Sequence, residues 1–267
     1  MEQDNKRNTL ISVDKDGDIS VKDVEKQIKK RQKKGNAFYR AVAAFVRWVM
    51  GALWPTKIYF KDNFLKNSKA IIICNHYSAL DPCVIISRLM NKDGKTVMKQ
   101  EVAQNKFIAK VADELGCIPI KRGEADVFAV KKILASLNRN QQVLIFPEGT
   151  RNRGDFKEML PFKTGVSTFA IKARAPIIPL MYYKKTGPFK RNRLFVGAPI
   201  WLDEFYDRKA NSVKEQATEY LYAKMCELRE EVDVLVEKCK GNKKKYLKFK
   251  RNQGKELLGN VGNGSKE

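Results

Sequence analysis

Short apolar runs rich in branched side chains recur along this chain, and each of them stops at a polar or basic turn. Runs of this length are typical of strands that a sheet buries on both faces. They predict strands at residues 70–74 and 143–146 and near Thr96–Lys99, Ile118–Ile120, Ile177–Tyr182 and Leu194–Gly197. Helical patterns lie between them, near Pro82–Asn91, Ala103–Leu115, Asp126–Asn138 and Gly165–Ala173. The alternation predicts an α/β fold in which helices cover both faces of a mixed, largely parallel sheet.

His76 is the only histidine among the 267 residues, and it follows the apolar run 70–74 almost directly. Open α/β sheets bind their ligands beyond the carboxyl ends of their strands. An imidazole at such a place can take and return a proton near neutral pH. On this residue alone, a structural histidine remains the alternative to a catalytic base.

Asp81 lies five residues after His76. On one continuous helix that offset would turn the two side chains about 140° apart, so they can meet only if His76 precedes the helix. Asp81 followed by Pro82 fits a helix N-cap with proline at the first helical position. One carboxylate oxygen can cap the helix while the other accepts the imidazole N–H. Ser78 fits a turn and Cys74 a strand core, so the pair indicates a general base acting on a substrate hydroxyl.

Two other strand ends carry cations. After residues 143–146, Pro147 ends the strand, Gly149 permits an unusual backbone angle, and Arg151 and Arg153 offer planar forks suited to phosphate. The strand near Ile118 ends in Lys121 and Arg122, and the strand at residues 175–180 is framed by Pro176 and Pro179. Each feature alone is weak, but their order along the chain is specific.

Four segments resemble the ordered motifs of the glycerolipid acyltransferase family, whose bacterial members include the 1-acylglycerol-3-phosphate acyltransferases: His76 to Asp81, Gly116 to Arg122, Phe146 to Arg151 and Ala175 to Leu180. The resemblance covers roughly residues 38 to 205. It implies that His76 is the catalytic base, that Asp81 orients it, and that Asn75 belongs to the substrate site. It also implies three further sets: phosphate contacts from Lys121, Arg122, Arg151 and Arg153, an acceptor pocket shaped by Glu148, Gly149 and Thr150, and an acyl side lined by Pro176 to Pro179.

The resemblance further implies the reaction. A fatty acyl group would pass from an acyl thioester, either acyl-CoA or an acidic acyl-carrier protein, to the sn-2 hydroxyl of 1-acylglycerol-3-phosphate, giving phosphatidic acid for phospholipid synthesis. Neither a metal nor another cofactor is expected. Lys121 stands where many relatives have an acidic residue, which leaves a different lysophospholipid acceptor as an alternative. A non-catalytic lipid-binding relative is a further alternative.

Residues 37–54 are strongly apolar and follow a basic stretch at residues 26–34. A spanning helix needs about 20 apolar residues, and Arg47 divides this run into two shorter pieces. A helix lying in the membrane interface fits the aromatic residues and the arginines best. A buried core helix and a transmembrane span are the alternatives. We therefore expect a peripheral or monotopic protein on the cytoplasmic side of the cell membrane.

The formal charge of +23 requires an anionic partner. Nucleic acid is the obvious rival, but no nucleic-acid-binding motif accompanies the charge and the His76–Asp81 pair would be idle. Anionic lipid explains both the charge and the apolar segment, at about 1 kcal/mol per basic residue near the surface. An acidic acyl-carrier protein would use the same surface, and we expect no nucleic-acid partner.

The segments divide the chain into five parts. A polar and basic extension (1–36) contains an Asp/Gly turn near Gly17 that resembles a calcium loop but lacks the glycine required at its sixth position. A membrane-binding helical segment (37–60), an acyltransferase α/β domain (61–208), a C-terminal helix (209–240) and a basic, flexible tail (241–267) follow.

Overall fold

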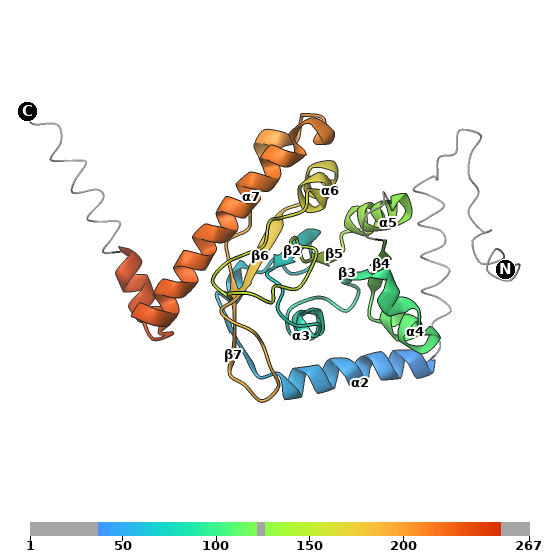
Figure 1. Cartoon of the computed structure of the whole chain (residues 1–267), viewed down its shortest axis with the longest axis horizontal. Helices are drawn as coiled ribbons and strands as arrows, with labels where there is room; N and C mark the ends of the chain where they lie inside the picture. Colours follow the sequence, from blue (N-terminus) through green and yellow to red (C-terminus); the bar gives the residue numbers. More distant parts are fainter. Residues whose placement is uncertain (1–36, 122–125, 252–267) are drawn as a thin grey trace, which may run out of the picture.

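A computed structural model describes residues 37–121 and 126–251 (Figure 1). The turn near Gly17 and the basic stretch 26–34 lie outside the described residues, as does Arg122. The described part forms one seven-stranded sheet with helices on both of its faces.

The strand order in the sheet is β1-β7-β6-β2-β5-β3-β4. All neighbouring strands are parallel except β6 and β7, which run antiparallel. This arrangement confirms the mixed, largely parallel sheet that the sequence predicts. The strands are β1 (Thr56–Tyr59), β2 (Ala70–Cys74), β3 (Lys95–Lys99), β4 (Cys117–Ile120), β5 (Gln142–Ile145), β6 (Ile177–Tyr182) and β7 (Asn192–Val196).

The helices divide between the two faces. They are α2 (Ala37–Leu53), α3 (Asp81–Arg88), α4 (Lys106–Glu114), α5 (Val127–Asn138), α6 (Gly165–Ala173) and α7 (Ala210–Asp233), which a short π-helical segment (Val234–Lys238) extends. One face of the sheet packs against α5, α6 and α7, and the other packs against α3. Helix α2 crosses beneath α3 and reaches α4, along one side of the molecule (Figure 1).

The central strand β2 joins the two cores. Successive side chains of a strand point to opposite faces, so Ile71 and Ile73 enter the core under α5 to α7 while Ile72 enters the core under α3. None of the three is exposed to solvent. Burial of each isoleucine stabilises the fold by about 1.5–3 kcal/mol, so the strand that leads to His76 is firmly anchored.

Residues 243–251, within the segment for which the sequence predicted a flexible tail, form a further helix. Tyr246 in this helix is buried, and its ring centroid lies 5.6 Å from that of Phe60. The Lys250 ammonium lies 2.7 Å from a Glu231 carboxylate oxygen of α7. Apolar residues interleaved with lysines therefore pack here against the end of α7 and the segment after β1.

Candidate active site

The site forms where β2, β5 and β6 end at one edge of the sheet. Asn75, the first residue after β2, is 1% exposed, and its side chain bonds the backbone of β6 twice. Its Nδ2 donates to the Tyr182 carbonyl at 2.9 Å and its Oδ1 accepts from the Tyr182 amide at 2.8 Å. Asn75 thereby ties the ends of β2 and β6 together and fixes where the chain leaves the sheet.

His76 and Asp81 meet as the sequence spacing required. The His76 Nδ1 lies 3.2 Å from Asp81 Oδ2, and Asp81 has no solvent exposure. A carboxylate can only accept here, so the proton of the neutral imidazole sits on Nδ1 and Nε2 is left as a proton acceptor. The ring stacks on Phe146 from β5, with centroids 4.0 Å apart and planes 25° from parallel. Packing and one hydrogen bond therefore orient the imidazole.

The expectation that Asp81 caps α3 is wrong. Leu80 occupies the N-cap position, and Asp81 is the first residue of the helix. Its Oδ2 turns back to accept from the amides of Tyr77 at 2.8 Å and Ser78 at 2.7 Å. Its Oδ1 accepts from the Thr186 hydroxyl at 2.7 Å. Capping would require the carboxylate to point forward along α3, whereas Oδ2 bonds the turn that holds His76 and Oδ1 bonds Thr186. These hydrogen bonds replace the ones that the buried Asp81 carboxylate would otherwise make with water.

The segment after β5 holds the His76 backbone from the other side. Glu148 Oε1 accepts from the His76 amide at 3.3 Å, and the Asn152 amide donates to the His76 carbonyl at 2.7 Å. Gly149 makes this possible with a φ of 69°, in the left-handed region that favours glycine. The turn after β2 and the segment after β5 are thus bonded to each other through backbone atoms as well as through a side chain.

Glu148 is an acid with an unusual environment. It is 2% exposed, and its Oε2 has no hydrogen-bond partner among the residues that the structure describes. Burial raises the pKa of Glu148 to about 7, against the opposing effect of the backbone amides of His76 and Leu160. Glu148 therefore carries a proton in a large fraction of molecules near neutral pH.

Arg151 and Arg153 are exposed on the same segment and flank the buried Asn152. The Asn152 side chain donates to the Glu158 carbonyl at 2.6 Å and accepts from the Gly154 amide at 2.9 Å, which fixes the loop between the two arginines. The two arginines line an open cavity of about 820 Å³ together with Tyr77, the neighbour of His76; its other residues are Asn152, Gly154, Phe156, Lys184, Lys185 and Lys190. No carboxylate lines this cavity, and two guanidinium forks there suit a phosphate group.

The structure does not bring every predicted site residue to this place. Lys121 is exposed at the end of β4, three strands from β2 and so about 14 Å away across the sheet. Pro176 lies at the opposite edge of the sheet, where its carbonyl accepts from the Ile71 amide. Pro179 is buried inside β6 beside Ile73. Thr150 is exposed and does not line this cavity; with Arg151 and Arg153 it lines a neighbouring one.

Sequence reasoning missed the loop between β6 and β7, residues 183–191. Thr186 in this loop is buried and bonds Asp81, although 105 residues separate the two. Lys184, Lys185 and Lys190 face the two arginines across the cavity. Lys184 and Lys185 directly follow an apolar strand, as Lys121 and Arg122 do, and this repeated pattern was the signal that could have found them.

Known proteins match both the sequence and the fold. Residues 55–183 match the Acyltransferase family. Over 202 residues the chain is 25% identical to the 1-acyl-sn-glycerol-3-phosphate acyltransferase of Bacillus subtilis, a match that covers 74% of this chain and 100% of that relative. The enzyme of the same name from Cocos nucifera is 28% identical, over 70% of this chain and 59% of its own length.

A solved structure is similar as well: the 1-acyl-sn-glycerophosphate (LPA) acyltransferase PlsC of Thermotoga maritima. It has a TM-score of 0.54 and 19% identity, and the match covers 74% of this chain and 83% of that chain. At this identity the likeness shows the fold. In sequence, in fold and in the His76–Asp81 pair at the end of β2, the chain is thus similar to acyltransferases.

Proposed function

We propose that this acyltransferase moves a fatty acyl group from an acyl thioester to the sn-2 hydroxyl of 1-acylglycerol-3-phosphate, giving phosphatidic acid for phospholipid synthesis. The donor is acyl-CoA or an acyl-carrier protein. The single observation that carries the proposal is the imidazole of His76, held by a buried Asp81 through Nδ1 beside a cavity that two arginines line. A base and a phosphate clamp at one place suit an acceptor that carries a hydroxyl and a phosphate on neighbouring carbons.

The chemical step uses one proton and no cofactor. His76 Nε2 accepts the proton of the acceptor hydroxyl while the oxygen attacks the thioester carbonyl, and a carbon–oxygen bond forms. The carbon–sulfur bond then breaks, and the imidazolium returns its proton to the departing thiolate. A general base of this kind contributes about 10²- to 10⁴-fold to the rate, and holding both substrates in place contributes more.

The buried groups around His76 support this route because they fix the base before substrate arrives. Asp81 accepts the Nδ1 proton and stabilises the imidazolium that forms. The arginines bind the acceptor phosphate, Arg151 on one side of Asn152 and Arg153 on the other. A phosphomonoester suits this cavity better than a zwitterionic headgroup does, because no carboxylate lines the cavity to receive a headgroup cation.

We further propose that the protein works on the cytoplasmic surface of the cell membrane, with α2 lying in the interface. Phe38, Phe45 and Trp48 are each more than half exposed, and their spacing places them on one face of α2. The exposed Phe107 of α4 lies against Tyr39 of α2, with ring centroids 5.8 Å apart. Contiguous exposed apolar surface of this kind marks an interaction site. No helix in the described part of the chain is long and apolar enough to cross a bilayer.

Anionic lipid attracted by the basic surface would supply the second signal that interfacial anchoring needs. The same surface charge suits an acidic acyl-carrier protein, and we assign it no nucleic-acid partner. Binding to anionic vesicles should weaken with salt without vanishing, because salt screens the charge but leaves the apolar face unaffected. Replacing Phe45 and Trp48 with serine should abolish the vesicle binding that remains at high salt, as a sedimentation assay would show.

The experiment that tests the proposed reaction measures free-thiol release from an acyl thioester with a panel of acceptors. Lysophosphatidic acid should be acylated faster than lysophosphatidylcholine or lysophosphatidylethanolamine, and mass spectrometry should identify phosphatidic acid as the product. Faster acylation of another lysophospholipid would show that this lipid, and not lysophosphatidic acid, is the acceptor. Absence of thiol release with every acceptor and both donor types would leave only a lipid-binding role.

A further inference from the structure

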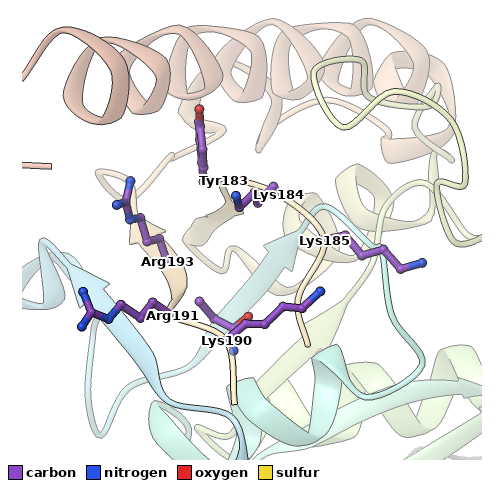
Figure 2. Close-up of a pocket in the computed structure, with 7 residues that line it drawn as sticks. Tyr183, Lys184, Lys185, Lys190, Arg191 and Arg193 are labelled. Atoms are coloured by element: carbon purple, nitrogen blue, oxygen red, sulfur yellow. The ribbon is translucent and has the colours of Figure 1, made fainter. Parts of the chain in front are cut away.

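The loop between β6 and β7 presents cations on both of its sides, and the proposed reaction leaves one side unused. The cations are Lys184, Lys185 and Lys190, followed by Arg191 and Arg193 at the start of β7. They line a cavity of about 350 Å³ with Tyr183 and Asn192. Figure 2 shows Lys185 and Lys190 extending to one side of the loop and Arg191 and Arg193 to the other. The three lysines line the same cavity as Arg151, whereas Arg191 and Arg193 do not line that cavity.

The backbone that carries these cations is fixed at several points. The Gly187 amide donates to Asn192 Oδ1 at 3.1 Å, and Asn192 Nδ2 returns a bond to the Gly187 carbonyl at 3.0 Å. The Phe189 amide donates to the Leu53 carbonyl at the end of α2, at 2.8 Å. Because Thr186 also bonds Asp81, the loop is held against both α2 and the catalytic turn.

No opposing charge balances the arginine side. A neighbouring cavity of about 450 Å³ joins Arg191 and Arg193 to three further cations and contains no carboxylate; these are Lys57, Arg88 and Lys240. None of the ion pairs formed among the described residues uses a cation of the β6–β7 loop. Cations gathered in cavities without counter-charges focus a field that attracts anions.

The sheet order separates this cluster from the arginines of the acceptor site. Arg151 follows β5, which is next to β2 on one side, and β7 lies two strands from β2 on the other side. The start of β7 is therefore about 10 Å from β2 across the sheet. The two clusters thus lie on opposite sides of His76.

The two substrates need phosphate sites at different distances from the base. The phosphate of the acceptor sits on the carbon next to the reacting one, so it must bind close to His76. The phosphate of an acyl thioester donor lies at the far end of the pantetheine arm, so it must bind further away. Arg191 and Arg193 meet the second requirement, because they lie at the start of β7, two strands from β2, and do not line the cavity of Arg151.

We propose that Arg191 and Arg193 bind the phosphate end of the acyl thioester donor, namely the 4′-phosphopantetheine phosphate that CoA and acyl-carrier proteins share. The inference rests on the proposed function and adds to it the place where the donor enters. The thioester then reaches His76 from the β7 side while the acceptor approaches from the β5 side. With CoA as the source, the nucleotide phosphates extend into the cavity of Lys57 and Arg88.

The test is the double substitution Arg191→Gln and Arg193→Gln, assayed by thiol release. With acyl-CoA the KM for the donor should rise at least about tenfold, the size expected when charge-assisted hydrogen bonds are lost. The KM for lysophosphatidic acid should stay within about twofold. The matched control removes two exposed cations at the opposite edge of the sheet, Lys66→Gln and Lys172→Gln, and should change neither constant.

A donor without phosphate makes the test decisive. With acyl-N-acetylcysteamine, kcat/KM of the double variant should equal that of the unmodified protein. An equal loss with this donor, or a rise in the KM for the acceptor, would overturn the proposal. Assays with acyl-carrier protein distinguish the sources: a loss with both donors assigns the shared phosphate, and a loss with acyl-CoA alone assigns the nucleotide phosphates to these cations.

Calorimetric binding of free CoA separates this proposal from the proposed function. The unmodified protein should bind CoA, and the double variant should bind it at least about tenfold more weakly. Weaker CoA binding by the variant in a protein that releases no thiol would retain the phosphate site and discard the reaction. Equal binding of CoA by both proteins, in an enzyme that is active with acyl-CoA, would retain the reaction and discard the site.

Discussion

The buried and the exposed residues of the candidate site differ in how many partners they already have. Asp81 and Thr186 are buried and bonded to each other, and Asn75 is buried and bonded to β6. Arg151 and Arg153 are exposed, and no ion pair among the described residues uses them. The geometry of the base is therefore set in the folded protein, whereas the guanidinium groups are open to a ligand.

This difference indicates which residues act in the chemical step and which bind the substrate. Groups that act on developing charge must be oriented in advance, because reorientation during the reaction would add to the barrier. Groups that bind an acceptor phosphate do so in the ground state and in the transition state alike. Substitutions in the buried set should therefore lower kcat, and substitutions in the exposed set should raise KM. The predictions below test that division.

The largest effect is expected at His76. In the His76→Ala protein, kcat should fall at least about a hundredfold, because the proton of the acceptor hydroxyl has no base to receive it. Asp81→Asn should be milder, since the imidazole remains present but its tautomer is no longer controlled. Thiol release under saturating substrates measures both.

Folding must be checked beside activity for these two variants. The His76 side chain lies in a turn at the end of β2, so circular dichroism should be almost unchanged by His76→Ala. The melting temperature should fall, because the contacts with Phe146 and Asp81 are lost. A well-folded His76→Ala protein that turns over near the normal rate would contradict the mechanism.

A smaller effect, and one confined to binding, is expected at Arg151. Arg151→Gln should raise the KM for lysophosphatidic acid about tenfold while kcat stays within about twofold, because the fork binds phosphate in both states. Lys172→Gln, which removes an exposed cation at the far edge of the sheet, is the control. A fall in kcat at unchanged KM would place Arg151 with the buried set instead.

Thr186 tests whether the buried set extends beyond the sequence motifs. Thr186→Val keeps the shape of the side chain but leaves Asp81 Oδ1 without its donor, and kcat should fall about five- to thirtyfold. The KM for lysophosphatidic acid should stay within about twofold, because Thr186 acts through Asp81. Thr186→Ser restores the hydroxyl and should restore kcat, which a purely structural role for the methyl group would not predict.

Local patterns in the sequence predicted most of the sheet and the His76–Asp81 pair. Strand β2 and its turn are contiguous in the chain, so branched residues followed by the His76 spacing were enough. The orientation of Asp81 was mispredicted because Asp81-Pro82 also fits a cap, and only the folded turn shows which amides the carboxylate meets. Thr186 reaches Asp81 because β6 and β7 run antiparallel and their loop returns over the site, a long-range feature that local spacing does not encode.

The smallest expected effect concerns stability alone, and it belongs to Glu148. Burial raises the pKa of this carboxyl to about 7 in the folded protein, above its value of about 4.3 in an unfolded chain. The folded state therefore binds the proton more tightly, so this stabilisation is fully present below about pH 4.3 and is lost as pH rises toward 7. The glutamine of Glu148→Gln cannot ionise. Between about pH 4.3 and pH 7, the unfolding free energy of this variant should therefore rise relative to that of the unmodified protein, by on the order of 2 kcal/mol. Its melting temperature should rise with it. Glu219→Gln on the exposed face of α7 should show no such trend. A constant difference in melting temperature between Glu148→Gln and the unmodified protein from pH 4 to pH 8 would show that folding does not raise the pKa of Glu148.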